Sequence, residues 1–464
     1  MDSKNVLLVA PRLNDPRIQT EMYPSGALLL MGTMLSNLGH NVKIVHMATD
    51  HVAPFQLEKI LSSFKPDIVG LTVNTFQTAS AKQVSRIVKN INKDILVVIG
   101  GPHPSALGVK TFNDFHYVDI VVVGEGEHTF LDIVDGKKDL EEISGICYTS
   151  KMNKPRPLAK DLDYIPLPNL DLVDITRFIG ASPIGAYPSM YIMASRGCPF
   201  CCTFCNKSVW GNTVRFRKPE LIIKEIEWLH QRYGIKEIYF QDDTFNLNRE
   251  WTERIFSLII DHELNKEIVY KTPFRVNERL VDKELLQLAK DAGFWMIFYG
   301  VESGNQRMLD SMKKGITVAE IRRAFELTHE VGIKTIASFI LGMPGETEQS
   351  IKDSVNLLKV LKTEYFGFSY AMPFPETELT ETLIEKNHIL ETDYDKYSGQ
   401  CIVRTDSLTR EELISYYVHY IKKEAIKMKL EHMTLWEKIR KGVKHPILSL
   451  QIIGERVKEK EKSF

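Results

Sequence analysis

The 464-residue sequence is poor in cysteine, and it lacks several features that would assign it to a simple class. Its net charge is −1, so no global field points to nucleic acid as a partner. No apolar run reaches the roughly 18–20 residues that a membrane span needs. The start, MDSKNVLLVA, has neither the basic region nor the long apolar segment of a signal peptide. We therefore expect a cytoplasmic protein that binds no nucleic acid and keeps its thiols reduced.

The first part of the chain, to about residue 135, alternates short β-branched runs with helical stretches. Such alternation predicts a parallel sheet covered by helices on both faces, with ligands bound in the loops beyond the carboxyl ends of the strands. Those loops are rich in glycine, at 100–105 and 124–129. The predicted strands are 5–10, 41–47, 67–73, 95–100 and 119–124.

A second α/β region begins near residue 189, after a stretch rich in proline and charge. Six further strands separated by amphipathic helices predict an open or partial (β/α)₆ barrel. These strands are 190–195, 237–242, 268–274, 295–301, 335–342 and 366–372. We predict a doubly wound first domain, a linker, a barrel and a helical carboxyl-terminal extension, with boundaries 1–140, 141–187, 188–390 and 391–464.

Four of the six cysteines lie in one short stretch, SRGCPFCCTFC, from Ser195 to Cys205. Structural zinc sites usually have two separated cysteine pairs, and no second pair exists because Cys147 and Cys401 are isolated. Three thiolates, Cys198, Cys202 and Cys205, can instead hold three irons of a [4Fe–4S] cluster and leave the fourth iron open to a ligand. Spacing alone leaves a second register open, with Cys201 in place of Cys202.

The cysteine spacing and its RGCPF flank resemble the radical S-adenosylmethionine superfamily. The resemblance implies that S-adenosylmethionine chelates the open iron and that an electron from the cluster cleaves it to a 5′-deoxyadenosyl radical. A cluster or zinc ion that only staples the fold is the alternative. Polar or glycine-rich residues follow all six predicted barrel strands, which is where barrel enzymes place their functional residues.

By this resemblance, the strand-end residues would bind S-adenosylmethionine. Asp242 or Asp243 would hold its amino group, and Arg275 would pair with its carboxylate. The nucleoside would contact Phe204, Glu302, Gly342 and Gly345. As alternatives, Asp242 would cap the following helix and Arg275 would form a structural ion pair. Many relatives have Pro-Gly-Thr after the last strand, whereas this chain has Pro-Glu-Thr at 375–377, which leaves the shape of that loop open.

The first region resembles the cobalamin-binding domain of one branch of the superfamily, through segments 24–45, 67–75, 97–106 and 119–130. The implied contacts with cobalamin come from Thr72, Asn74, Thr75, Gly100, Gly101, Pro102, His103, Gly124, Glu125 and Gly126. The D-x-H-x-x-G motif that supplies a histidine below the cobalt is missing, so we expect His103 to line the corrin or its nucleotide. The alternative is a sheet that binds another nucleotide or nothing.

Together these resemblances imply a methyltransferase that uses methylcobalamin and acts on an unactivated carbon of an unknown organic substrate. One S-adenosylmethionine would remethylate cobalt, and a second would yield the radical that abstracts hydrogen. A flavodoxin or ferredoxin would supply electrons, and the substrate-side catalytic residues are unassigned. The alternatives are a non-methylating reaction, such as oxidative cyclisation or ring contraction, and a non-catalytic iron–sulfur or cobalamin sensor.

The carboxyl-terminal segment 421–464 is basic, with twelve Lys or Arg and six Asp or Glu residues. Its mixture of basic and apolar residues favours a solvated helical tail that packs on the barrel. The alternative is a surface helix near anionic lipid or a phosphorylated substrate.

Overall fold

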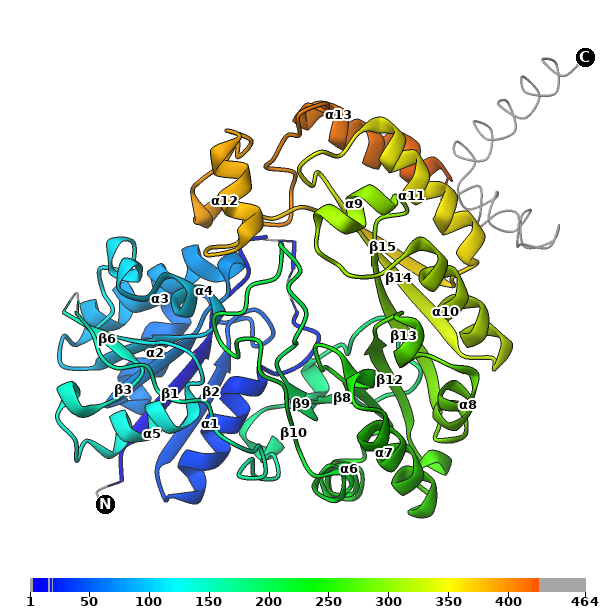
Figure 1. Ribbon diagram of the computed structural model, residues 1–464. Coiled ribbons are helices and arrows are strands. Elements are labelled where there is room, and N and C mark those ends of the chain that lie inside the picture. Colours follow the sequence, from blue (N-terminus) through cyan, green and yellow to red (C-terminus); the bar gives the residue numbers. More distant parts are fainter. Residues whose placement is uncertain (1–2, 16, 19, 150, 425–464) are drawn as a thin grey trace, which may run out of the picture. The chain divides into compact units, whose positions relative to one another are not determined.

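A computed structural model describes residues 3–424 except 16, 19 and 150 (Figure 1). The chain divides into two compact units between Arg410 and Glu411. The first unit contains two α/β sheets, which confirms the predicted fold class. Helix α13 (Arg410–Ser415) begins at the last residue of the first unit and is followed in the second unit by a π-helical segment at Tyr416–Ile421. The rest of the predicted helical, basic tail, from residue 425, lies outside the described residues.

The first sheet has seven strands in the order β2-β1-β3-β4-β5-β6-β7. The pairings among β1–β5 are parallel, as predicted, and β6 and β7 add antiparallel strands at one edge. These two strands fall inside the segment that we predicted as linker. The strands are β1 Asn5–Ala10, β2 Asn41–His46, β3 Ile68–Thr72, β4 Leu96–Gly100, β5 Ile120–Val122, β6 Ile146–Tyr148 and β7 Lys151–Met152. The helices are α1 Gly26–Asn37, α2 Pro54–Phe64, α3 Thr78–Ile91, α4 Pro102–Leu107 and α5 Glu127–Asp135.

The two faces of the first sheet differ in the size of their side chains. One face is filled by large aliphatic residues such as Leu7, Val69 and Val97, which pack with α2 and α3 in one apolar core. On the opposite face, Leu8 of β1 is paired in register with Gly70 of β3, and a Cβ on Gly70 would meet Phe130 of α5 at 2.9 Å. Because strand side chains alternate between faces, Gly70 lies on this second face, where it leaves room for the ring of Phe130.

The second sheet has six strands, all parallel, in the order β15-β14-β13-β12-β11-β8. All six predicted barrel strands are confirmed: β8 Ser189–Ile192, β11 Glu237–Phe240, β12 Val269–Phe274, β13 Phe294–Glu302, β14 Lys334–Leu341 and β15 Tyr365–Tyr370. A short hairpin of β9 (Ser195–Arg196) and β10 (Arg215–Phe216) carries the cysteine loop between its strands. The helices are α6 Pro219–Tyr233, α7 Arg249–Asp261, α8 Lys283–Asp291, α9 Gln306–Ser311, α10 Val318–Glu330, α11 Glu348–Leu361 and α12 Glu378–Glu385.

A fully buried ion pair fastens the segment before β8 to the amino-terminal end of the barrel strands. Lys271 of β12 lies 3.2 Å from Glu237 of β11 and also donates to the carbonyls of Ala181 and Pro183. The second carboxylate oxygen of Glu237 accepts from the backbone N–H of Gly185 at 2.9 Å. Every proton of the ammonium group and both carboxylate oxygens thus have partners, as buried charges require.

The chain returns to the first sheet after the barrel. Residues 389–405 contain a 3₁₀ turn at Tyr394–Lys396, and Asn14 donates to the carbonyls of Tyr394 and Tyr397 at 3.0 Å each. Lys82 of α3 pairs with Asp395 at 3.0 Å. The predicted extension therefore begins as a non-helical strap on the first sheet, and its α-helix starts only at Arg410. Within the described range, no helix has the length and apolar character to cross a membrane.

Candidate active site

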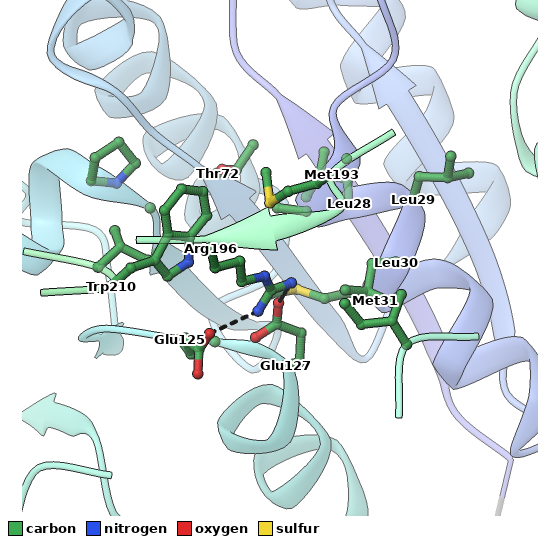
Figure 2. Close-up of a pocket in the computed structure, with 18 of the residues that line it drawn as sticks. Leu28, Leu29, Leu30, Met31, Thr72, Glu125, Glu127, Met193, Arg196 and Trp210 are labelled. Carbon is green, nitrogen blue, oxygen red and sulfur yellow. Dashed lines mark hydrogen bonds and ion pairs between the residues drawn. The ribbon is translucent and has the colours of Figure 1, made fainter. Parts of the chain in front are cut away.

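A cavity of about 390 Å³ lies between the carboxyl-terminal edge of the first sheet and the cysteine loop of the barrel (Figure 2). From the barrel side it is lined by Cys198, Cys205 and Asp243, among others. The lining from the first sheet includes most of the residues predicted to contact cobalamin: Thr72, Gly100, Gly101, Pro102, Gly124, Glu125 and Gly126. The structure therefore brings two groups of residues, predicted from separate motifs, to one cavity.

Glycines form part of the cavity wall because a side chain would not fit there. Gly101 has φ +105°, and a Cβ would lie 2.7 Å from the carbonyl oxygen of Val73. A Cβ on Gly126 would lie 3.0 Å from Met31 of α1. Gly70 of β3 also lines the cavity, and sequence reasoning missed it because one glycine inside a strand is a weak indication. Backbone walls and apolar neighbours suit a large ligand with flat, apolar surfaces, so these residues fit a corrin.

Three residues predicted to contact cobalamin lie outside the lining of this cavity: Asn74, Thr75 and His103. The Asn74 side chain accepts from the N–H of Phe76 and caps a 3₁₀ turn. Thr75 Oγ1 lies 3.1 Å from His103 Nδ1, and the imidazole stacks edge-on against Tyr394 of the strap. Burial, together with nearby Lys82, lowers the pKa of His103 to about 4. His103 is therefore a neutral ring packed under the strap.

The Glu125 carboxylate is held by two buried arginines from the hairpin that flanks the cysteine loop. Its oxygens lie 2.9 Å from Arg196 and 2.8 Å from Arg215, and Arg196 also pairs with Glu127 at 2.7 Å (Figure 2). Burial alone would raise the pKa of Glu125, but hydrogen bonds from Arg215 and Arg196 lower it. Sequence reasoning missed this cluster, although basic residues on both sides of the cysteine loop were the available indication.

Three of the four clustered thiols lie near one another. The pKa of Cys205 is raised to about 11, because the surrounding protein desolvates its thiol although the residue is exposed, and because Asp243, Cys202 and Cys198 disfavour added negative charge. Cys201 is likewise exposed. No three His, Cys, Asp or Glu side chains of the described residues converge as ligands of a single ion. Ligands of separate irons in one cluster need not converge, so the triad Cys198, Cys202, Cys205 fits a [4Fe–4S] cluster.

Lys207 holds the cysteine loop from within, and sequence reasoning missed it. Its ammonium group donates to the carbonyls of Cys198 and Phe200 and to Asn212. Its positive charge also lowers the pKa of Cys205, opposing the effect of burial. Lys207 therefore both shapes the loop and favours thiolate at its last cysteine.

The two adjacent aspartates have different environments. Asp242 is buried and accepts from the backbone N–H and hydroxyl of Ser195, and burial raises its pKa to about 7. It does not cap the following helix α7, whose cap is Asn248. Asp243 is exposed, lines the cavity, and accepts from the backbone N–H of Gly197. Of the two, Asp243 is the one with a carboxylate open to a ligand.

Arg275 lies against the cysteine loop and has a spare donor. Its guanidinium lies 3.5 Å from the ring centroid of Phe200, and its Nε donates to Asn277 at 2.7 Å. Nη2 is buried without a hydrogen-bond partner, and Arg275 makes no ion pair with any described residue. A guanidinium with a free donor is suited to a carboxylate ligand. The structural ion pair that we considered for Arg275 is not formed within the described part of the chain.

Glu302 is held at the end of β13 in a conformation that is rare for residues other than glycine. Its φ is +62°, beside an irregularity in the pairing of β13 with β14. Its carboxylate accepts from Lys314 at 2.6 Å, and the Lys314 ammonium lies 5.9 Å from the ring centroid of Phe204. A Cβ on Gly300 would meet Glu302 Oε1 at 2.5 Å. Backbone strain of this kind is concentrated at functional sites.

The loop after β14 contains a buried carboxyl group beside the two glycines that we predicted to approach adenine. Gly342 and Gly345 have φ +84° and +81°, and open space surrounds the Cβ position of Gly345. The N–H of Gly342 donates to Glu346 Oε2, whereas Glu346 Oε1 is buried without a partner. Burial raises the pKa of Glu346 to about 8, so the group is largely protonated at neutral pH.

The departure from Pro-Gly-Thr has a structural counterpart. Glu376 has φ +56°, a value that favours glycine, and its carboxylate pairs with Lys110 of the first sheet's domain at 3.0 Å. Asn206 of the cysteine loop donates to the carbonyl of Pro375 at 2.9 Å. The loop therefore keeps the backbone shape that glycine would allow, and the glutamate adds an exposed contact to the first region.

Two family profiles match the chain, one on each α/β region. The profile of the B12 binding domain matches residues 16–134, and that of the radical SAM superfamily matches residues 192–358. The first range contains the glycine loops of the cavity and the second contains the cysteine loop.

Similar proteins include curated relatives and solved structures. An uncharacterized methyltransferase of Pyrococcus horikoshii is 34% identical over 86% of this chain and 87% of its own length. An anaerobic magnesium-protoporphyrin IX monomethyl ester cyclase of Rubrivivax gelatinosus is 27% identical over 84% of this chain and 71% of its own. The radical S-adenosylmethionine methyltransferase TsrM from Kitasatospora setae, solved with cobalamin and a [4Fe–4S] cluster, has the same fold, with TM-score 0.69 and 20% identity over 89% of this chain and 85% of that one.

Proposed function

Because this chain belongs to the family of radical S-adenosylmethionine enzymes with a B12 binding domain, we propose that it transfers a methyl group to an unactivated carbon of an organic substrate. It is an enzyme of the methyltransferase-like type, and its cofactors are a [4Fe–4S] cluster, S-adenosylmethionine and cobalamin. The observation that carries the proposal is the single cavity lined by the glycine loops of the first sheet and by Cys198, Cys205 and Asp243. Methyl transfer between two cofactors needs both to face one enclosed space.

In this proposal, residues of the cysteine loop and residues of the first sheet hold different cofactors. Cys198, Cys202 and Cys205 hold the cluster, and Cys201 is spare; the coupling of the Cys205 thiol with Cys202 and Cys198 supports this register. The glycine loops and Thr72 hold cobalamin at the carboxyl-terminal edge of the first sheet. When bound, the reduced cluster supplies the electron that cleaves S-adenosylmethionine, and cobalamin supplies the methyl carrier.

The groups proposed for S-adenosylmethionine surround the cysteine loop. Asp243 would accept hydrogen bonds from its amino group, and the free Nη2 of Arg275 would donate to its carboxylate. Glu302 and Phe204 would contact its nucleoside, with Lys314 fixing Glu302. Gly342 and Gly345 would let the backbone approach adenine, and buried Asp242 would position the strand before the cysteine loop through Ser195.

The proposal extends to the surroundings of the enzyme and its domains. The enzyme uses a substrate and a reductant; we propose a flavodoxin or ferredoxin as that reductant and the cytoplasm as its location. For the domains we propose the boundaries 1–140, 141–187, 188–390 and 391–464, which enclose both profile matches, with β6 and β7 of the second segment completing the first sheet. The lipid contact proposed for the basic tail lies outside the described residues.

The test uses S-adenosylmethionine labelled in its methyl group and the anaerobically reduced full-length enzyme. The candidate substrates are compounds chosen from the functions of neighbouring genes. Methyl transfer should label the product and release S-adenosylhomocysteine and 5′-deoxyadenosine in roughly equal amounts. Similarity to the cyclase favours one other outcome, an unlabelled product with 5′-deoxyadenosine alone. That outcome would replace methyl transfer by a cyclisation or ring contraction. Failure to cleave S-adenosylmethionine at all would point to a sensor.

A further inference from the structure

The β9–β10 hairpin forms the base, or neck, of the cysteine loop, and a group of buried charged residues lies there between the two regions. Arg196 and Arg215 are paired directly across the β9–β10 hairpin, whose connecting loop carries all four clustered cysteines. Just inside this neck, a Cβ on Gly197 would lie 2.2 Å from the carbonyl of Thr213. The loop is therefore pinched at its base, and the two arginines mark the place.

One carboxylate from the first region clamps this neck. Glu125 Oε1 pairs with Arg196 and Glu125 Oε2 with Arg215, so a single side chain draws together two like charges that would otherwise repel. All three side chains are less than one-tenth exposed, and water screens the charges little. Since Glu125 lies between Gly124 and Gly126 of the cavity wall, a shift of that wall displaces the neck of the cysteine loop.

The hydrogen bonds of these buried arginines are not complete within the protein. Arg196 Nε, Arg215 Nε and Arg215 Nη2 are buried with no hydrogen-bond partner among the described residues. Arg217, two residues further on, also leaves its Nε without a partner, and both Arg196 and Arg217 line the cavity. Native proteins rarely leave buried donors unpaired, so such donors at a cavity call for an acceptor.

We propose that Arg196 is a positioning residue that couples cobalamin binding to the cysteine loop: it donates to an oxygen of cobalamin and, clamped by Glu125, holds the neck of that loop. The inference rests on the proposed binding of cobalamin in this cavity. The acceptor is a carbonyl of a corrin amide or the phosphodiester of the nucleotide, which present the same oxygen chemistry to a guanidinium. By linkage, cobalamin and the cluster then stabilise each other's binding.

The first test measures binding of hydroxocobalamin by absorbance titration to the full-length protein with its cluster reconstituted. Arg196→Lys keeps the charge but removes the spare donor, so affinity should fall about tenfold or more, while iron content stays that of the wild type. Dicyanocobinamide, which lacks the nucleotide, identifies the acceptor: an equal loss indicates a corrin amide, and no loss indicates the phosphodiester. Arg254→Lys, at an exposed arginine of α7, is the matched control.

The second test measures coupling as the rate of iron release to a chelator, with and without saturating hydroxocobalamin. In the wild type, cobalamin should slow release severalfold. In Glu125→Gln, which breaks the clamp, it should change the rate little, although both ligands still bind. The inference fails if wild-type protein binds cobalamin and both variants behave as it does. Failure of the wild type to bind cobalamin would instead overturn the proposed function. If Glu125→Gln does not fold, Arg196→Lys still decides the matter.

Discussion

The molecule contains two buried clusters of charge that look alike and differ in how completely their polar atoms are paired. At the base of the barrel, Lys271 and Glu237 satisfy each other together with backbone groups and Trp295. Between the two regions, Arg196 and Arg215 share Glu125 but retain unpaired donors. The Lys271–Glu237 pair, which we call the seal, has every polar atom paired and no free donor for a ligand. The group of Arg196, Arg215 and Glu125, which we call the open cluster, has unpaired donors at a cavity wall and is arranged to bind a ligand.

The comparison also separates stability from function along the chain. The seal fastens the segment 181–189 to the amino-terminal ends of the barrel strands, away from the cysteine loop. The open cluster is at the opposite ends, where barrel enzymes carry their chemistry. Substitutions in the seal should therefore unfold the protein without a specific effect on any one cofactor. Substitutions near the open cluster should instead remove a cofactor without unfolding the protein.

The largest expected effect is on the [4Fe–4S] cluster. Cys202→Ala should abolish the [4Fe–4S] absorption and iron content after reconstitution, because it removes one of three ligands. Cys201→Ala should retain both, since the proposed ligands are Cys198, Cys202 and Cys205, and the pKa of Cys205 is coupled to Cys202 and Cys198. The melting temperature of the apoprotein should be the same in both variants. Loss of the cluster in Cys201→Ala, with retention in Cys202→Ala, would assign the ligands to the other register.

The next effect concerns the seal. Lys271→Met leaves Glu237 charged, buried and without its counterion, so the barrel should lose about 3–5 kcal/mol of stability. Urea denaturation followed by tryptophan fluorescence measures this, since Trp295 donates to Glu237 at 3.0 Å. The double variant Lys271→Met/Glu237→Gln should recover much of the loss, and exposed Lys266→Met should change little. An unchanged urea midpoint in Lys271→Met would show that the ion pair does not stabilise the barrel.

Much of this architecture is readable from the sequence, because it depends on local patterns. All eleven predicted strands form, and the cysteine loop follows the first barrel strand as expected. Glycines 100, 101, 124 and 126 line the cavity because their loops end parallel strands at one edge. These features follow from alternation, glycine content and spacing, which need no knowledge of distant contacts.

Among the missed features, Lys207 has partners close in sequence, whereas the arginine cluster and the surroundings of His103 depend on pairs distant in sequence. Arg196 meets Glu125 across 71 residues, and His103 is covered by the strap that returns from residue 394. The sequence showed these residues as charged or polar loop positions, and spacing could not tell which partner each would take. Glu125 was predicted only as a contact of cobalamin, and the ion pairs of its carboxylate with two arginines were not foreseen.

The last effect, which depends on pH, concerns Glu346: one of its oxygens accepts from Gly342 and the other is unpaired, so its pairing is intermediate between the seal and the open cluster. Its pKa is about 8 in the folded protein against 4.5 for the ordinary group, because burial disfavours the charge. Stability from this group is complete below pH 4.5 and is lost as pH rises towards 8, by at most about 1.4 kcal/mol per pH unit. Glu346→Gln cannot ionise, so its apoprotein should gain on the wild type in melting temperature between pH 5.5 and 8. Exposed Glu326→Gln should follow the wild type, and parallel curves for Glu346→Gln would mean that the carboxyl is already charged in the fold.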